Sequence, residues 1–373
     1  IILSGLNSGD GTIQPIRVNA ASSNPELIPD PTIAYESGNE SGTLTFEPVI
    51  DKNGSATITV TVEDGGLDNN IETVSDNAIT TKIFEINITP LPIPEDVSIA
   101  EYGSVSINHK WQTIELQGVY ENAVVITSDP TRKGGDPAVV RLKNIDSDSF
   151  QLKLQEPRYK DGWHVNETVS YMVIEEGTWE LSNGTTLEAG TLNTNILSSQ
   201  GRNTVALDAE FDSDSSPAVL TQVQTFKGSD WVTTRTDNIT GESFQVMMQE
   251  EEKLNTGVHV TESIGWLAIE RGAGTAGDTI IDAGVTADKF THQTQFHWFG
   301  ASFDGGPTLL AKLDSFDGAD TANARIKSVT DSGFSAMISE EQSRDREWFH
   351  TTESLSYLAL GGSSGVLNGI AVS

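Results

Sequence analysis

The sequence contains no cysteine and few basic residues, and both shortages limit what the protein can be. Without cysteine the chain has no disulfide, no thiol nucleophile and no cysteine-ligated zinc or iron–sulfur site. Its 373 residues carry 54 acidic and 22 basic side chains, which gives a formal net charge of −32. We therefore expect no nucleic-acid partner and no docking on anionic lipid, because contact with phosphate requires clustered lysine and arginine.

Long apolar segments are missing as well. No apolar run approaches the roughly 20 residues that a membrane-spanning helix requires, so we expect no membrane insertion. The sequence has no glycine-rich phosphate loop that ends in Lys-Ser or Lys-Thr, and no Gly-x-Ser-x-Gly nucleophile elbow. It begins at Ile1 without a methionine or a charged leader, which predicts a mature piece or an excised fragment.

Apolar residues alternate with period two, and glycine, asparagine, aspartate and proline separate the short runs. This pattern predicts an all-β protein. Four apolar side chains of the run 55–64 fall on one face of a strand, namely Ala56, Ile58, Val60 and Val62. Asn53-Gly54 before this run predicts a hairpin with the run 41–49. We interpret residues 1–95 as an immunoglobulin-like β-sandwich that ends in a proline-rich linker.

The first 95 residues also carry a resemblance, through "LSGLNSGDG", "SGTLTFEPV", "GSATITVTVEDGG" and "FEINITP". These segments resemble the immunoglobulin-like and cadherin-like repeats of large bacterial surface and secreted proteins. The resemblance implies a spacer or adhesive unit that is extracellular or on the cell surface, which we expect of an aquatic bacterium. The acidic loop residues Glu63, Asp64 and Asp68 are placed either to bind calcium or to face solvent, and the sequence predicts no other cofactor.

Residues 97–373 contain three copies of one module. "SFQLKLQEPRYKDGWHVNETVSYMVIE" in the first copy matches "SFQVMMQEEEKLNTGVHVTESIGWLAIE" in the second and "GFSAMISEEQSRDREWFHTTESLSYLALG" in the third. Each copy ends in a glycine-bounded tail, "TTLEAGT", "TIIDAGV" or "GVLNGIA". We therefore predict three tandem antiparallel β-sandwich modules, at 97–200, 201–290 and 291–373.

Most apolar positions keep only their class between copies, as a tolerant core allows, whereas five positions are stricter. They are the arginines Arg141, Arg235 and Arg325; the phenylalanines Phe150, Phe244 and Phe334; the glutamates Glu156, Glu250 and Glu340; the histidines His164, His259 and His350; and the glutamates Glu167, Glu262 and Glu353. An aromatic residue follows four positions later, as Tyr171, Trp266 or Tyr357. Strand parity places both glutamates at the ends of buried rows. Our hypothesis is that each module gathers its arginine, histidine and two glutamates into one polar cluster at one edge.

Two interpretations of this cluster remain open. A sugar site requires donors, carboxylate acceptors and an aromatic platform, to which Trp163 and Trp348 would add further rings. A structural network that fixes strand register requires only that the same groups be buried and paired. A metal site built on His-x-x-Glu is disfavoured, because the arginine would repel a divalent cation. Three copies of one cluster favour multivalent binding over catalysis, so we expect no enzyme activity.

The modules carry a second resemblance. The order of a "PAV" strand, an arginine, a "T-x-x-x-F" strand and a terminal "WLAI" strand is similar to the H-type lectin domain. That family implies an antiparallel β-sandwich that binds N-acetylgalactosamine-like sugars and usually assembles as trimers. The three arginines fall on the family's arginine and the three histidines on its histidine. The family's early-loop aspartate is not matched in all three copies, because Asp212 and Asp304 lie in such a loop but the first copy has Glu121.

The lectin resemblance implies a non-catalytic carbohydrate-binding or adhesion region with a glycan or extracellular polysaccharide as partner. The copies would form either a pseudo-threefold head within one chain or separate beads along it. The alternative function is purely structural, as a repeat of a surface layer, fibre or stalk whose polar clusters form a structural network.

Overall fold

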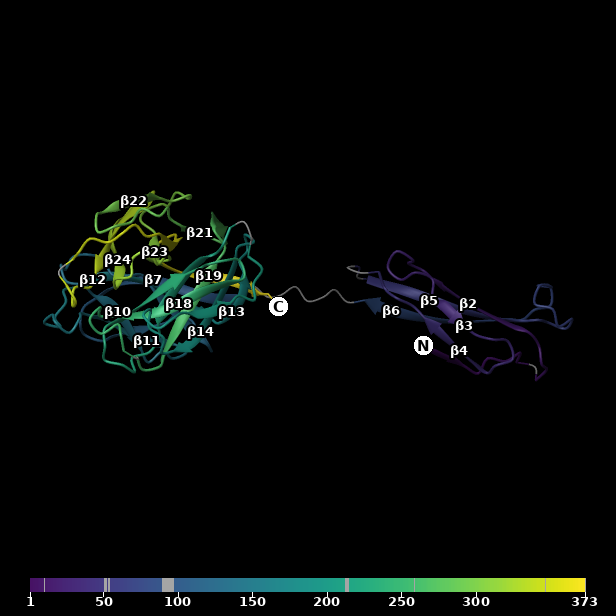
Figure 1. Ribbon diagram of the computed structural model, residues 1–373. Coiled ribbons are helices and arrows are strands. Elements are labelled where there is room, and N and C mark those ends of the chain that lie inside the picture. The colour runs from purple at the N-terminus through teal and green to yellow at the C-terminus, as the bar shows by residue number, and fades with distance from the viewer. Residues whose placement is uncertain are drawn as a thin grey trace. The chain divides into compact units, whose positions relative to one another are not determined.

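The computed structural model describes residues 1–9, 11–49, 52, 54–88, 97–211, 215–257, 259–345 and 347–372. These residues contain twenty-seven strands, every strand pairing is antiparallel, and no helix occurs among them, so the predicted all-β class is confirmed. A helix that is long and apolar enough to span a membrane is accordingly not found in the described part of the chain. The chain forms two compact units, Ile1–Ile93 and Pro94–Ser373 (Figure 1).

Two three-stranded sheets form the first unit. One contains β1 (Ile2–Ser4), β4 (Ser41–Thr45) and β3 (Thr32–Ala34), and the other contains β2 (Ile16–Ser22), β5 (Gly54–Asp64) and β6 (Ile79–Ile88). The apolar face predicted for β5 is confirmed, because Ala56, Ile58 and Val60 are buried in the core of this unit. The hairpin predicted between β4 and β5 is wrong, since these strands lie in different sheets. Asn53 of the predicted turn lies outside the described residues.

Each repeat of the second unit contains a larger and a smaller sheet. The first repeat has β9 (Ala123–Thr127), β12 (Glu167–Glu175), β7 (Val97–Ile107) and β27 (Ser364–Ala371) against β10 (Val139–Lys143), β11 (Ser149–Gln155) and β8 (Gln112–Glu115). The second has β16 (Ala218–Val223), β19 (Glu262–Ile269), β14 (Thr186–Thr194) and β13 (Gly177–Glu180) against β15 (Asn203–Ala206), β18 (Ser243–Glu250) and β17 (Val232–Asp237). The third has β23 (Thr308–Leu313), β26 (Leu355–Leu360), β21 (Thr279–Val285) and β20 (Gly272–Ala276) against β22 (Gln295–Trp298), β25 (Gly333–Glu340) and β24 (Ala322–Val329).

The glycine-bounded tails do not stay with the repeat that precedes them. Strand β14 pairs with β19 of the second repeat, β21 pairs with β26 of the third, and the last strand β27 returns to pair with β7 of the first. The sheets therefore divide the chain between β12 and β13 and between β19 and β20, ahead of the predicted boundaries near 200 and 290. A short pairing of β13 with β27 joins the larger sheets of the first two repeats into one eight-stranded sheet.

Four apolar cores stabilise the second unit. Each repeat has a core of its own between its two sheets, and a fourth core draws side chains from the larger sheets of all three repeats. The shared core includes Ile126 and Met172, Leu220 and Leu267, and Leu310 and Leu358. Strands β16, β23 and β26 are buried at every position, because one face covers the repeat's own core and the other covers the shared core. The three repeats thus form one compact unit (Figure 1).

Removal of β27 should destabilise the whole second unit. A chain that ends at Gly362 leaves an edge of β7 without its partner and removes Leu367, which is only 2 % exposed, from the shared core. Since truncation of one buried leucine already costs about 2–5 kcal/mol, we expect a large fall in the melting temperature of this unit. Differential scanning calorimetry measures it, with the half-exposed Val366→Ala as a control that should melt like wild type. An unchanged melting temperature of the truncated chain would contradict the idea that β27 stabilises the unit by pairing with β7.

Candidate functional site: buried clusters between the repeats

A fully buried carboxylate stands at the centre of each cluster. Glu167, the first residue of β12, accepts hydrogen bonds from the hydroxyl of Thr131 (2.6 Å) and from the backbone amides of Lys133 (2.8 Å) and Gly134 (2.7 Å). The other repeats reproduce this pattern, with Thr225, Lys227 and Gly228 donating to Glu262 and Ser315, Asp317 and Gly318 donating to Glu353. One loop of each repeat is thereby folded around a carboxylate of the same repeat.

The histidine connects this carboxylate to the second repeated glutamate. In the first repeat Nδ1 of His164 lies 2.7 Å from Glu156, and Nε2 lies 3.3 Å from Glu167. His259 joins Glu250 to Glu262, and His350 joins Glu340 to Glu353, in the same way. A β-carbon at Gly134 would lie 2.9 Å from Nε2 of His164, so the close approach of loop and ring requires glycine there. The predicted gathering of the histidine and two glutamates of one repeat therefore occurs in all three.

The arginine comes from a different repeat than the one the sequence suggested. Arg141 of the first repeat pairs with Glu262 of the second (3.5 Å), and Arg235 of the second repeat pairs with Glu353 of the third (2.6 Å). Arg325 of the third repeat pairs with Glu167 of the first (3.0 Å). The hypothesis of a cluster contained within one module is corrected here, because each cluster spans an interface. The three pairs form a closed cycle, and all six side chains are 0 % exposed.

Each arginine also donates hydrogen bonds to backbone carbonyls of a loop in the neighbouring repeat. Arg141 donates to the carbonyls of Gly228 and Asp230, and Arg235 donates to that of Ser315. Arg325 donates to the carbonyls of three residues of the first repeat, namely Pro130, Thr131 and Asp136. The guanidinium groups are therefore occupied by the adjacent repeat on more than one side.

Burial and hydrogen bonding set the charges of these groups. Burial alone would raise the pKa of Glu167, but hydrogen bonds from His164, Thr131 and the loop amides lower that pKa to about 2. The pKa values of Glu262 and Glu353 are lowered to about 2 for the same reason. Burial would lower the pKa of His259, whereas its bonds to Glu250 and Glu262 raise that pKa to about 9. Arg141 keeps its charge at neutral pH, although burial lowers its pKa to about 10.

The aromatic residues fall into two groups. Tyr171, Trp266 and Tyr357, proposed from the sequence as a sugar platform, pack against core phenylalanines of their own repeats, at ring centroid distances of 5.4 to 5.7 Å. They therefore lie inside the modules. Trp163 and Trp348 lie at the surface, 61 % and 58 % exposed, together with Phe349.

Sequence reasoning missed two further repeated positions. Glycine recurs seven residues before each arginine, at Gly134, Gly228 and Gly318, and aspartate recurs five residues before it, at Asp136, Asp230 and Asp320. The spacing from the arginines is the signal that would have identified both. The glycines admit the histidine rings, while the first two aspartates pair with surface cations, Asp136 with Lys160 and Asp230 with Arg158.

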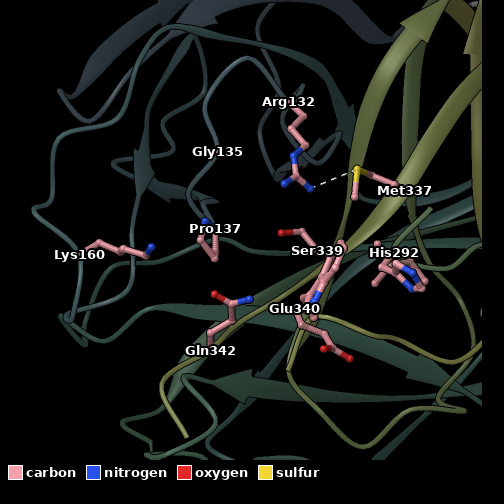
Figure 2. Close-up of a pocket in the computed structure, with 11 residues that line it drawn as sticks. Arg132, Gly135, Pro137, Lys160, His292, Met337, Ser339, Glu340 and Gln342 are labelled. Carbon is pink, nitrogen blue, oxygen red and sulfur yellow. Dashed lines mark hydrogen bonds between the residues drawn. The ribbon is translucent and has the colours of Figure 1, made fainter. Parts of the chain in front are cut away.

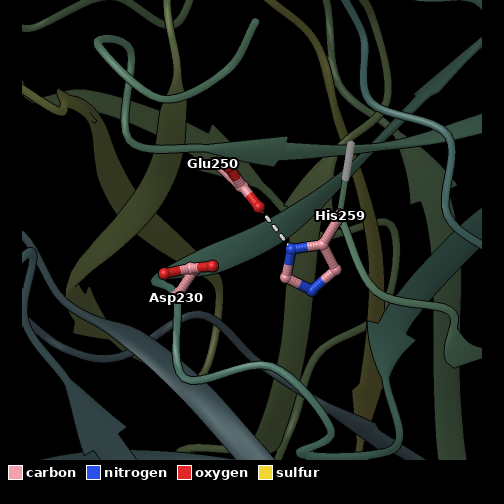
Figure 3. A group of neighbouring side chains, drawn as sticks. All are labelled: Asp230, Glu250 and His259. Atoms are coloured by element: carbon pink, nitrogen blue, oxygen red, sulfur yellow. Dashed lines mark hydrogen bonds and ion pairs between the residues drawn. The ribbon is translucent and has the colours of Figure 1, made fainter. Parts of the chain in front are cut away.

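One group of side chains has the composition of a metal site. Ligand atoms of Asp230, Glu250 and His259 lie within 4.8 Å of one another (Figure 3), and no other group of three such residues does so in the described part of the chain. Two cations already occupy this position, because Arg158 pairs with the Asp230 carboxylate and Arg141 donates to the Asp230 carbonyl. A divalent cation would have to displace them, so the arrangement disfavours a metal.

The acidic loop of the first unit uses its carboxylates internally. Glu63 pairs with Arg17 (2.7 Å) and accepts from Asn77. Asp64 accepts from the amides of Gly66 and Ala78, and Asp68 accepts from that of Asn70. These bonds stabilise the turn without a bound ion, and calcium at this loop stays a prediction.

Comparison with known proteins adds one relative. The chain is 29 % identical over 281 residues to halomucin of Haloquadratum walsbyi, and the match covers 71 % of this chain and 3 % of halomucin. No family model matches the chain, and no solved structure matches it. The similarity indicates a cell-surface or extracellular protein. Since halomucin comes from a halophilic archaeon, the bacterial source, like both family resemblances, stays a prediction.

Replacement of one buried arginine should destabilise the second unit strongly. Arg235→Ala leaves the Glu353 charge buried without its partner, which costs about 3–5 kcal/mol, whereas loss of the exposed Arg344 should cost well under 1 kcal/mol. A double-mutant cycle with Glu353→Gln measures the coupling, because the double variant buries no unpaired charge. Chemical denaturation gives the free energies. Equal, small losses for Arg235→Ala and Arg344→Ala would exclude the structural role.

The same clusters predict a stability maximum between two pH limits. The glutamates have folded pKa values near 2 against an ordinary value of 4.5, so their contribution is complete above pH 4.5 and is lost as the pH falls through 2. His259 has a raised pKa of about 9 against 6.5, so its contribution is complete below pH 6.5 and is lost as the pH rises through 9. Melting temperatures across pH 2–10 test both limits. The alkaline decline should weaken in His259→Gln, and an unchanged decline would contradict its origin.

Proposed function

We propose that residues 97–372 form a non-catalytic structural head of a cell-surface protein, in which the repeated arginine, glutamate and histidine clusters hold three modules in a closed ring. The observation that carries the proposal is the cycle of three fully buried arginine–glutamate pairs, each between different repeats. A ligand that used these groups would have to separate two repeats first. Burial and pairing of the charged groups with one another are the properties that a structural network requires and that an open sugar site lacks.

The cyclic order supports a unit that is preassembled within one chain. The third repeat donates its arginine back to the first, and the last strand returns to the first sheet, so no repeat is left with an open interface. At one point all three repeats meet, because Lys312 bonds both to Asp129 (2.6 Å) and to Gln222 (3.2 Å). Such a head suits a surface protein that must keep its shape without disulfides.

Hydrogen exchange tests this function on the intact chain. If the clusters are interface locks, Arg235→Ala should increase exchange in both the second and the third repeat and leave residues 1–88 unchanged. The first unit is the internal control, because it is a separate compact unit. An increase confined to the immediate surroundings of Arg235 would mean that the pair is a local contact and would argue against the head.

Carbohydrate binding is a second candidate function. It would use the exposed rings of Trp163, Trp348 and Phe349, called the rim below, and not the buried clusters. The observation that favours it is the exposure of Trp163 in the first repeat and of Trp348 and Phe349 in the third. Exposed rings can stack on the apolar face of a sugar, and several linked weak sites gain avidity. The corresponding Val258 of the second repeat lies outside the described residues. A glycan array probed with the intact chain and with a Trp163→Ala/Trp348→Ala variant tests this candidate.

High salt should stabilise the protein. A net charge of −32 makes the compact state repel itself, and added salt shortens the range of this repulsion from ~10 Å at 0.1 M to ~3 Å at 1 M. We therefore expect the melting temperature to rise between 0.1 and 1 M sodium chloride and then to level off. The buried pairs are less screened than surface charges and should not reverse this trend. A melting temperature that falls with salt would show that screened ion pairs dominate the stability.

A further inference from the structure

The interface between the third and the first repeat differs from the other two in a way that points to a ligand. We infer that it binds an anionic sugar residue, one that carries a carboxylate or a sulfate group. The inference rests on the second, carbohydrate-binding candidate and narrows it to one interface. It is independent of the structural role of the buried pairs.

The first difference is the residue beside the buried arginine. At the other two interfaces a phenylalanine ring of the neighbouring loop lies against the guanidinium. The ring centroid of Phe226 lies 4.5 Å from Cζ of Arg141, and that of Phe316 lies 5.0 Å from Cζ of Arg235. The equivalent loop position of the first repeat is Arg132, which faces Arg325. An apolar cover of the interface is thus replaced by a second positive charge.

The second difference is the residue that closes the interface beside this position. Gln155 donates from its side-chain amide to the carbonyl of Ser229 (2.8 Å), and Gln249 donates to that of Ala319 (3.3 Å). The equivalent residue of the third repeat is Ser339, whose short side chain makes no such bond to the first repeat in the described part of the chain. Two independent substitutions therefore leave space in the outer part of the same interface.

A cleft of about 70 Å³, open to solvent, occupies the space that these substitutions leave. Figure 2 shows Arg132 and Lys160 of the first repeat on one side and Ser339, Glu340 and Gln342 of the third repeat on the other. Sites that enclose a whole small molecule have volumes of about 300–1,000 Å³, so this smaller cleft suits the anionic group of a sugar residue, with the sugar ring lying at its mouth.

The charges of the cleft favour an anion. Lys160 is neutralised by Asp136 (2.6 Å), and Glu340 is paired with His350 (2.6 Å). The Arg132 guanidinium contacts the sulfur of Met337 (3.1 Å; Figure 2) and has no carboxylate partner among the described residues. A carboxylate or sulfate accepts two parallel hydrogen bonds from such a group, and it would also relieve the repulsion between Arg132 and Arg325.

The remaining lining favours a sugar over a bare anion. Trp348, more than half exposed, lines the cleft and offers a ring face, and His292 packs edge-on against it at 5.4 Å. Nδ1 of His292 has no hydrogen-bond partner in the described part of the chain, and Ser339 and Gln342 add a hydroxyl and an amide. Directed polar groups around a ring face match the hydroxyls and the apolar face of a sugar residue.

The repeats themselves supply the test variant. Arg132→Phe/Ser339→Gln gives this interface the residues of the other two, so it should fold while the cleft fills. Lys327→Ala, which removes one exposed cation of the third repeat outside the cleft, is the matched control. Isothermal titration of the intact chain uses four probes at one salt concentration: a uronate oligosaccharide, a sulfated galactan oligosaccharide, a neutral oligosaccharide of equal length, and sodium sulfate.

We expect at least one charged oligosaccharide to bind at least about tenfold more tightly than the neutral one and than sulfate. Arg132→Phe/Ser339→Gln should lose that binding, and Lys327→Ala should keep it. The uronate and sulfated probes identify which anionic group is used. Equal binding of neutral and charged probes, binding that survives in the double variant, or no binding of either charged probe would each overturn the inference. Neutral binding that needs Trp163 and Trp348 would leave the rim candidate standing.

Discussion

A buried carboxylate whose arginine partner comes from another module is the constraint on which the second unit depends. Transfer of such a group out of water costs several kcal/mol unless hydrogen bonds and an opposite charge compensate. Glu167, Glu262 and Glu353 receive the hydrogen bonds from their own loops, but the guanidinium comes from the preceding repeat in the cycle. A single repeat would therefore lack the arginine of this cluster, and the repeats are held together by an electrostatic contact as well as by apolar burial.

The same constraint explains why the repeats close into a ring. In an open row of three repeats, two arginine–glutamate pairs would form, and Arg325 at one end and Glu167 at the other would lack partners. Closure pairs these two residues and lets β27 cover the edge of β7. It also creates the shared core, to which each larger sheet contributes its second apolar face. Electrostatic pairing, strand pairing and apolar burial are thus completed by one geometric step.

Some of this arrangement was accessible from the sequence and some was not. The identity of arginine, glutamate and histidine across three otherwise divergent copies correctly set these positions apart from ordinary packing, and parity placed the glutamates at strand ends. Parity fixes the side of a strand on which a residue lies, but not the strand that faces it. Because every copy carries both Arg and Glu, pairing within a repeat and pairing between repeats leave the same pattern. The hairpin expected between β4 and β5 failed for a related reason, since β5 is paired on both edges, with β2 and β6.

Divergence between the interfaces is informative because the buried pair is constant. Phe226 and Phe316 correspond to Arg132, and Gln155 and Gln249 correspond to Ser339, while the paired arginines and glutamates do not change. An unpaired buried charge would cost more than the removal of a ring or of one hydrogen bond, so the positions around the pair can vary where the pair itself cannot. The pair therefore sets the geometry of all three interfaces and leaves their outer parts free to differ. A ring of similar modules can in this way keep its structure while one interface acquires chemistry that the others lack.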